Sequence, residues 1–311
     1  MSNVKVFYHG QDLDGWASGA IVKYKFPEAE MFPINYGDQF PWGEIKPDDI
    51  VYMVDFSLSV DDMEKLARYL GLKGCVASHN FFWIDHHKGI IDEMEKKKTA
   101  HDGVWIRGYQ QSGTAACEQV WWYLFGGVAP KFIRLLSLYD IWSHDDKEFN
   151  WDFIEGFQYG FKAYTKDPKD SMEFWKDWIL RSFNMNEREQ QDYVQLIAES
   201  GKLIKSYVED RFRLEISSRS YKINWEGYKC LVINSDPYIA NFMSRSKEFE
   251  GCDIAISYAN IRGESWAVSL RTLRDDIDLS KIAKKYKGGG HQKSAGFNWK
   301  SPGLPWEVEI K

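Results

Sequence analysis

Short apolar segments that stop at an acidic residue or a histidine recur near the start of the chain. Segments 4–8, 50–56 and 80–85 are rich in β-branched and aromatic side chains, and stretches with helical patterning separate them. Apolar runs of this length that alternate with helices are typical of buried strands in a parallel sheet covered by helices. Because open parallel sheets bind ligands at the carboxyl ends of their strands, we expect the chemistry of this chain at that edge.

The rest of the chain changes character twice. From about residue 112 the pattern becomes helical, and the expected helices are 113–125, 131–139, 171–183 and 186–214. Strands return after them, and the expected strands are 221–225, 229–233, 253–257 and 266–270. The length of 311 residues allows about two domains. We therefore predict an α/β chain with a parallel-sheet catalytic domain at 1–185, a connecting helix at 186–215 and a smaller α/β domain at 216–311.

The composition excludes several classes of protein. Hydrophobic residues make up 44% and charged residues 28%, as in an ordinary globular chain and unlike a disordered, collagen-like or coiled-coil one. No apolar stretch approaches the roughly 20 residues that span a bilayer, and the N-terminus lacks the apolar stretch of a secretory signal. We therefore expect a cytoplasmic protein with no membrane partner. The net charge of -6 disfavours non-specific binding of a long polyanion but permits a short anionic substrate at a local site.

Acidic residues and histidines gather at the ends of the predicted elements. The candidate metal ligands are His9, Asp12, Asp14, Asp55, His86 and Asp140. Asp12 and Asp14, two apart in a segment expected to be extended, would point the same way. Carboxylates that converge at one sheet edge repel each other, and divalent metal ions supply the compensating charge. Oxygen and imidazole donors without a thiolate suit Mn²⁺, and the four scattered cysteines indicate neither a zinc site nor a disulfide framework.

Six candidate ligands exceed what one ion normally takes from a protein, so two ions are expected. Asp55 would bridge them, and two metals roughly 3.5 to 4 Å apart can generate a hydroxide nucleophile and stabilise the leaving oxygen in phosphoryl transfer. Because adjacent side chains diverge in an extended segment, His86 and His87 should not both bind metal, and one of them should face the substrate or buttress the site. A single Asp at a strand end is commonly a helix cap, so the prediction depends on the conjunction of four such elements in order.

Four motifs resemble those of the DHH family of phosphoesterases. They are His9-Gly-Gln-Asp12-Leu-Asp14-Gly15, Val54-Asp55, Asp85-His86-His87 and Tyr139-Asp140. The C-terminal part resembles the DHHA1 accessory domain of subfamily 1 through Val268-Ser-Leu-Arg271-Thr and Gly288-Gly-Gly-His291-Gln-Lys-Ser-Ala-Gly296. Together these motifs cover most of the chain, and within the family they are most similar to oligoribonucleases of the nanoRNase B type.

The resemblance implies a role for each motif. Asp55, His86 and His87 would be catalytic, with His87 stabilising phosphate charge. The expected substrate-binding residues are Arg271, Gly288, Gly289, Gly290 and His291. The residue types fit this role, because glycines let backbone amides approach an anion, and Arg271 and His291 add hydrogen-bond donors for a phosphate or a base edge.

We therefore expect a metal-dependent phosphodiesterase that hydrolyses short oligonucleotides to mononucleotides with two Mn²⁺ ions, for which Mg²⁺ or Co²⁺ could substitute. Its partner would be short single-stranded RNA or DNA or a dinucleotide, and the chain could form a homodimer. A hydrolase of cyclic or linear dinucleotides or of 3'-phosphoadenosine 5'-phosphate is the nearest alternative. A nuclease for long single-stranded DNA is a third, and a pyrophosphatase ranks lower. From another class, a catalytically silent nucleotide sensor could use the same scaffold.

Overall fold

The computed structural model describes the chain apart from residues 1–2, 72–78, 100–103, 301–302 and 308–311. Two compact units divide the chain, Met1–Lys205 and Ser206–Lys311. Helix α8 (Glu187–Arg219) continues through the boundary between them. Each unit has its own sheet and its own hydrophobic core. Among the described residues, no helix is both long and apolar enough to cross a membrane.

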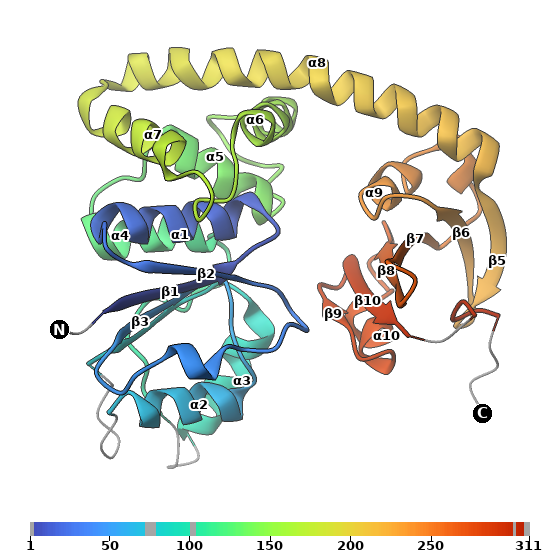
Figure 1. Cartoon of the computed structure of the whole chain (residues 1–311). Helices are drawn as coiled ribbons and strands as arrows, with labels where there is room; N and C mark the ends of the chain where they lie inside the picture. Colours follow the sequence, from blue (N-terminus) through green and yellow to red (C-terminus); the bar gives the residue numbers. More distant parts are fainter. Residues whose placement is uncertain (1–2, 72–78, 100–103, 301–302, 308–311) are drawn as a thin grey trace. The chain divides into compact units, whose positions relative to one another are not determined.

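A four-stranded parallel sheet forms the centre of the first unit, as the sequence pattern predicts (Figure 1). Its strands are β1 (Val4–His9), β2 (Glu30–Ile34), β3 (Ile50–Val54) and β4 (Phe81–Ile84), in the order β2-β1-β3-β4. The edge strand β2 is absent from the expected strands, because Glu30 and Pro33 interrupt its short apolar run. Both faces of the sheet are buried, which explains why the central strands are apolar throughout.

Helices cover both faces of this sheet (Figure 1). One face carries α1 (Leu13–Lys25), α4 (Ala116–Phe125), α5 (Lys131–Asp140), α6 (Trp151–Tyr164) and α7 (Met172–Asn184). The other face carries α2 (Val60–Tyr69), α3 (Lys88–Thr99) and the short 3-10 helix η1 (Trp42–Glu44). Successive strand residues alternate between the two cores: Val54 and Ile84 pack in the first, and Met53 and Trp83 pack in the second.

The aromatic-rich middle of the chain is mainly core. Phe157 and Phe161 of α6 and Trp175 of α7 are fully buried, and they pack in the same cluster as Val54 of the sheet. Helix α6 was not among the helices expected individually from the sequence, because its two glycines and its aromatic residues all round obscure a single apolar face. Helix α7 contacts α1 and helix α6 contacts α5, so these helices support α1, which lies against the sheet.

The second unit contains a mixed six-stranded sheet with the order β5-β6-β7-β8-β10-β9. Its strands are β5 (Tyr221–Trp225), β6 (Tyr228–Asn234), β7 (Ile254–Ile261), β8 (Ser265–Arg271), β9 (Gly289–Gly290) and β10 (Ser294–Trp299). The short helices are α9 (Ile239–Met243), η2 (Lys247–Phe249) and α10 (Leu279–Lys285). The first four strands overlap those expected from the sequence, whereas β9 and β10 were not expected, since three glycines in this segment favour a loop.

Candidate metal centre

The register of the parallel strands brings motif residues into one row. Tyr8 pairs with Val54 and Val54 pairs with Ile84, so the residues that follow each strand leave the same edge of the sheet. Asp55 is the central one, and its backbone N–H donates to the Ile84 carbonyl at 3.0 Å. Its φ of 52° lies in the left-handed region, which Asp tolerates better than most residues. This turn of the backbone places a buried carboxylate at the sheet edge.

Asp12 and Asp14 do not lie in an extended segment, and this corrects the prediction that their side chains point the same way. Asp12 is the N-cap of α1, where its carboxylate accepts a hydrogen bond from Gly15 N at 2.9 Å, and Asp14 lies in the first helical turn. An Asp at the N-cap keeps an extended backbone but begins a helix, because its side chain accepts from otherwise unpaired N–H groups. A Cβ at Gly15 would lie 2.1 Å from the His9 carbonyl, so only glycine permits this close approach of helix and strand.

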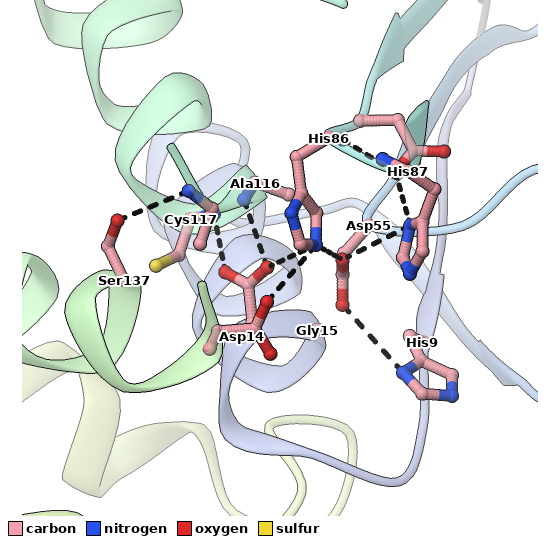
Figure 2. A network of polar contacts seen from close by, with 12 residues as sticks. His9, Asp14, Gly15, Asp55, His86, His87, Ala116, Cys117 and Ser137 are labelled. Atoms are coloured by element: carbon pink, nitrogen blue, oxygen red, sulfur yellow. Dashed lines mark hydrogen bonds and ion pairs between the residues drawn. The ribbon is translucent and has the colours of Figure 1, made fainter. Parts of the chain in front are cut away.

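The Asp14 carboxylate is held by the start of another helix. It accepts hydrogen bonds from the backbone N–H groups of Ala116 and Cys117, at 2.9 and 2.7 Å (Figure 2). Unpaired amides and the helix dipole make such an N-terminus favourable for an anion. Helix α4 therefore holds the Asp14 carboxylate in place from a position about 100 residues away in the chain.

His86 and His87 both turn toward Asp55, which corrects the expectation that these neighbouring side chains diverge (Figure 2). They follow β4 in a turn rather than in a strand. His86 Nε2 lies 3.3 Å and His87 Nδ1 lies 4.0 Å from Asp55 Oδ1. Asp85 makes this turn possible, because its fully buried carboxylate accepts from the backbone N–H groups of both histidines and from Trp83 Nε1.

Asp85 also determines the protonation state of His87. The two side chains are 2.7 Å apart, from His87 Nδ1 to Asp85 Oδ1. Burial lowers the pKa of His87, but the charge and hydrogen bond of Asp85 outweigh burial and raise that pKa to about 9. Burial likewise raises the pKa of Asp85, and the two histidines hold it below its usual range instead. In the metal-free protein, Asp85 and His87 are therefore both charged at neutral pH.

All six expected ligands lie in one continuous cluster. Three groups within it could each hold a metal ion: Asp55, His86 and His87; His9, Asp12 and Asp55; and Asp14, His86 and Asp140. Within each group one donor atom per residue lies within 4.8 Å of the others. Asp140 comes from the last turn of α5, and its Oδ2 is 3.1 Å from His86 Nε2. Asp55 and His86 each belong to two groups, so they connect the whole cluster.

The electrostatics of the cluster favour a bound cation. Burial raises the pKa of Asp55 well above its usual value, and the charges of Asp14 and Asp12 raise it further. Burial and the same two carboxylates raise the pKa of Asp140 well above its usual value too. Asp55 Oδ1 is a buried acceptor that has no hydrogen-bond partner among the described residues. Oxygen and imidazole donors around this unsatisfied oxygen fit a divalent ion such as Mn²⁺.

Two residues beside the cluster have no signal in the sequence. Tyr36 follows β2, and its ring lies 5.7 Å from the His9 ring and 5.9 Å from the His87 ring, measured between centroids. Lys162 of α6 places its Nζ 3.4 Å from the centroid of the Trp16 ring. Tyr36 lies in an ordinary polar turn and Lys162 is a helix-surface lysine, so only the tertiary structure brings them to this site.

The expected substrate-binding residues lie together in the second unit. Arg271 ends β8 and pairs with Ser294 of β10, and a tight turn joins Ser294 to His291, where His291 N donates to the Ser294 carbonyl at 2.7 Å. A Cβ at Gly288 would lie 2.1 Å from the Gly296 carbonyl. Gly290 has a φ of 129°, and a Cβ there would also collide with β10.

The three glycines differ in the space around them. Gly288 and Gly290 are required by strand packing, and only Gly289 has open space where a side chain would be. Gly289 is therefore the position at which the absence of a side chain leaves the backbone accessible to a ligand.

Metal binding is expected to stabilise the protein strongly. Mn²⁺ at about 100 times its dissociation constant should add about 2.7 kcal/mol, which for a unit of this size raises the melting temperature by roughly 5 to 10 °C. The cause is relief of repulsion among Asp14, Asp55 and Asp140. Differential scanning fluorimetry with Mn²⁺, with chelator, and with K⁺ at equal ionic strength measures the shift. An unchanged melting temperature in Mn²⁺ would contradict a metal centre here.

Comparison with known proteins adds independent information. The DHHA1 domain family matches residues 234–306, within the second unit. Oligoribonuclease NrnB of Bacillus subtilis (strain 168) is 21% identical over 315 residues, which cover 93% of this chain and 71% of the relative. Uncharacterized protein R106 of Acanthamoeba polyphaga mimivirus is 23% identical over 317 residues, covering 94% of this chain and 66% of that protein, about two thirds of its length.

A solved structure shows the fold. It is described as the DHH domain of a member of the s1p family of ribosomal proteins, and it superposes with a TM-score of 0.55 at 14% identity, covering 98% of this chain and 84% of the other. The parallel sheet of the first unit and the DHHA1 match in the second confirm the resemblance to DHH/DHHA1 phosphoesterases drawn from the sequence motifs.

Proposed function

We propose that this protein is a two-metal phosphodiesterase that hydrolyses short oligonucleotides to mononucleotides, with Mn²⁺ as its metal. The observation that carries the proposal is the sharing of Asp55 and His86 among three ligand groups. A single ion would need only one such group, whereas a shared carboxylate with ligands on both sides of it fits two neighbouring ions.

The ligand groups suggest how the two ions would be held. His9, Asp12 and Asp55 would hold one, and Asp14, His86 and Asp140 would hold the other, with Asp55 between them. Asp14 contributes a charge that α4 fixes in place, and His9 Nδ1 lies 2.6 Å from Asp12 Oδ2 and 3.7 Å from Asp55 Oδ2. When bound, two divalent ions supply Lewis acidity toward a phosphate and lower the pKa of an attacking water.

His87 is suited to bind the phosphate that is cleaved. Its Nδ1 is engaged by Asp85, which fixes the ring orientation, and its Nε2 would donate to a phosphate oxygen. Asp85 is thus a positioning residue, since it is buried and acts through both histidines. This arrangement would stabilise negative charge on the phosphate.

Short substrates are supported by the charge and by the second unit. The net charge of -6 disfavours non-specific binding of a long strand. Arg271 at the end of β8 and the open backbone of Gly289 in β9, on either side of β10, would supply hydrogen-bond donors that grip one end of an oligonucleotide. The relative from Bacillus subtilis is named an oligoribonuclease, in agreement with this substrate class. A cytoplasmic location and a homodimer stay predictions.

A digestion panel tests the proposed function. In Mn²⁺, end-labelled RNA of two to five residues should yield mononucleotides faster than a 24-residue strand, a cyclic dinucleotide or 3'-phosphoadenosine 5'-phosphate. Rates that rise with strand length would instead indicate a nuclease for long strands, and a preference for either of the other two compounds would reassign the substrate. Tight binding of a short oligonucleotide without turnover in Mn²⁺ would favour a nucleotide sensor.

Replacement of Arg271 should weaken binding more than chemistry. Arg271→Ala is expected to raise KM by roughly 10-fold to 100-fold, the effect of losing one charge-assisted hydrogen bond, with little change in kcat. Steady-state kinetics on a three-residue RNA provides the measurement, and Arg262→Ala is a matched control because Arg262 lies in the turn between β7 and β8, at the other end of β8. A fall in kcat at unchanged KM would place Arg271 in the chemical step and contradict its binding role.

A further inference from the structure

Helix α5 ends in a turn that normally requires glycine, but a tryptophan occupies the position. Trp142 N donates to the Tyr139 carbonyl at 3.1 Å, and Ser143 N donates to the Leu138 carbonyl at 2.9 Å. This pair of hydrogen bonds defines a helix end whose residue after the cap is left-handed and is usually glycine. Trp142 has a φ of 58° there. A bulky residue in this conformation is strained, so the backbone gains nothing from tryptophan at this position.

The ring of Trp142 contacts several other aromatic rings. Its centroid lies 4.7 Å from that of Trp151 and 6.2 Å from that of Tyr139. Tyr139 stacks on Trp151 at 5.6 Å and an interplanar angle of 8°, and His144 stacks on Trp151 at 4.1 Å. Tyr139, His144 and Trp151 thus all contact the indole, and 43% of the residue is exposed.

Core packing does not account for this tryptophan. The tryptophans that build the core of this unit are almost fully covered, Trp175 at 0% and Trp178 at 4% exposed. Trp142 combines a strained backbone with a large exposed aromatic surface, and strain of this kind is concentrated at functional sites. A rigid, half-exposed indole is the group with which proteins stack an unpaired base.

The place of Trp142 in the chain connects it to the candidate metal centre. It lies two residues after Asp140, so the Cα atoms of the two residues are at most about 7 Å apart. We propose that Trp142 is a base-stacking platform, which binds the nucleobase of a nucleotide whose phosphate lies at the metal centre. The proposal extends the proposed function, because it presumes a nucleotide substrate at that centre. Stacking accepts every base, since each has a π-face, so the platform predicts affinity without sequence preference.

The test compares variants that separate stacking from backbone structure. Trp142→Gly suits the left-handed turn, so its melting temperature should equal or exceed that of the wild type. Its KM for a two-residue RNA in Mn²⁺ should rise about 10-fold, since stacking of one base contributes on that scale. Trp142→Phe should retain most of the affinity. Trp105→Ala is the matched control, because Trp105 is 54% exposed but lies just before the bridge between Arg107 and Phe82, toward the amino end of β4.

A substrate that lacks a base identifies the contact. Two dinucleotides are used, each of which lacks the base of one nucleoside. For one of them, the affinity of the wild type should fall by about as much as Trp142→Gly lowers the affinity for the intact dinucleotide. Trp142→Gly should bind that abasic compound as well as it binds the intact dinucleotide. An unchanged KM for Trp142→Gly on the intact dinucleotide would overturn the proposal. Equal losses by the variant on the intact dinucleotide and on both abasic ones would overturn it too, because they would indicate a disturbed Asp140 and not a lost stack.

If the proposed function is wrong, a binding measurement still tests the stacking platform. If the wild type cleaves none of these compounds, titration calorimetry with the same intact and abasic dinucleotides measures stacking directly. Binding that is weakened about 10-fold by Trp142→Gly would then support the platform on a protein that does not hydrolyse the ligand. Absence of binding by the wild type would overturn both proposals, and equal binding by wild type and variant would overturn the platform alone.

Discussion

Asp55→Asn is expected to abolish turnover and to stabilise the metal-free protein. Asp55 is common to two ligand groups, and it is the proposed bridge between the ions. The neutral amide cannot hold two cations, so kcat on a three-residue RNA should fall by roughly 10³-fold or more. The substitution should also remove the stabilising effect of Mn²⁺ on the melting temperature.

The gain in stability has a separate physical cause. At neutral pH the metal-free fold contains a buried carboxyl that burial and the charges of Asp14 and Asp12 keep from ionising freely. An amide of the same shape removes this repulsion, and Asn also tolerates the left-handed backbone. The free energy of unfolding should rise by about 1 to 3 kcal/mol without metal.

Urea denaturation in chelator measures that gain, and the same variant assayed in Mn²⁺ measures the loss of activity. Asp48→Asn is a suitable control, because Asp48 is an exposed carboxylate at the amino end of β3, on the opposite edge of the sheet. Near-normal cleavage by Asp55→Asn would exclude Asp55 as the bridge. Lower stability of the metal-free variant would show that the carboxylate is satisfied by contacts within the protein.

Asp85→Asn is expected to lower both activity and stability. Its effect on the stability of the fold is thus opposite to that of Asp55→Asn. The Asp85 carboxylate accepts four hydrogen bonds, from Trp83 Nε1, from both histidine N–H groups and from His87 Nδ1. An amide keeps one acceptor oxygen and leaves a protonated His87 without its counter-charge. Removing one partner of a buried ion pair costs about 3 to 5 kcal/mol.

The loss of activity should be smaller than for Asp55→Asn, since Asp85 acts through its neighbours. We expect a fall in kcat of roughly 10-fold to 100-fold, as for a residue that orients a metal ligand. The pH profile distinguishes positioning from a general loss of folding: the activity of the variant should decline at lower pH than that of the wild type, because without Asp85 the pKa of His87 falls below about 9. Wild-type kinetics with wild-type stability would contradict a positioning role.

The sequence predicts the sheet of the first unit well because each strand there is a compact apolar run. Once Val4–His9, Ile50–Val54 and Phe81–Ile84 are strands of one parallel sheet, the convergence of their following residues is a consequence of register. The sequence could not predict how individual side chains turn. Asp12 caps the helix that contains Asp14, and the buried Asp85 accepts hydrogen bonds in the segment that aims His86.

Other features depend on tertiary contacts between distant segments. The amides that hold Asp14 belong to α4, and nothing near Asp14 in the sequence indicates them. Gly288 and Gly290 are close to a neighbouring strand that the sequence pattern conceals, so their role in packing could not be distinguished from a role in anion binding. Nothing in the sequence distinguishes Trp142 from the other tryptophans, and only its backbone conformation in the structure does so.

Because backbone amides of α4 bind the Asp14 carboxylate, the residues of the candidate metal centre can come together during synthesis only in a certain order. Translation releases the segment with His9, Asp12 and Asp14 first, but the amides of Ala116 and Cys117 and the carboxylate of Asp140 emerge only after about a hundred further residues. If the proposed metal ions bind here, a nascent chain cannot complete their site before α4 and α5 have been synthesised. The choice of metal would then be made only after the first unit has folded around its sheet.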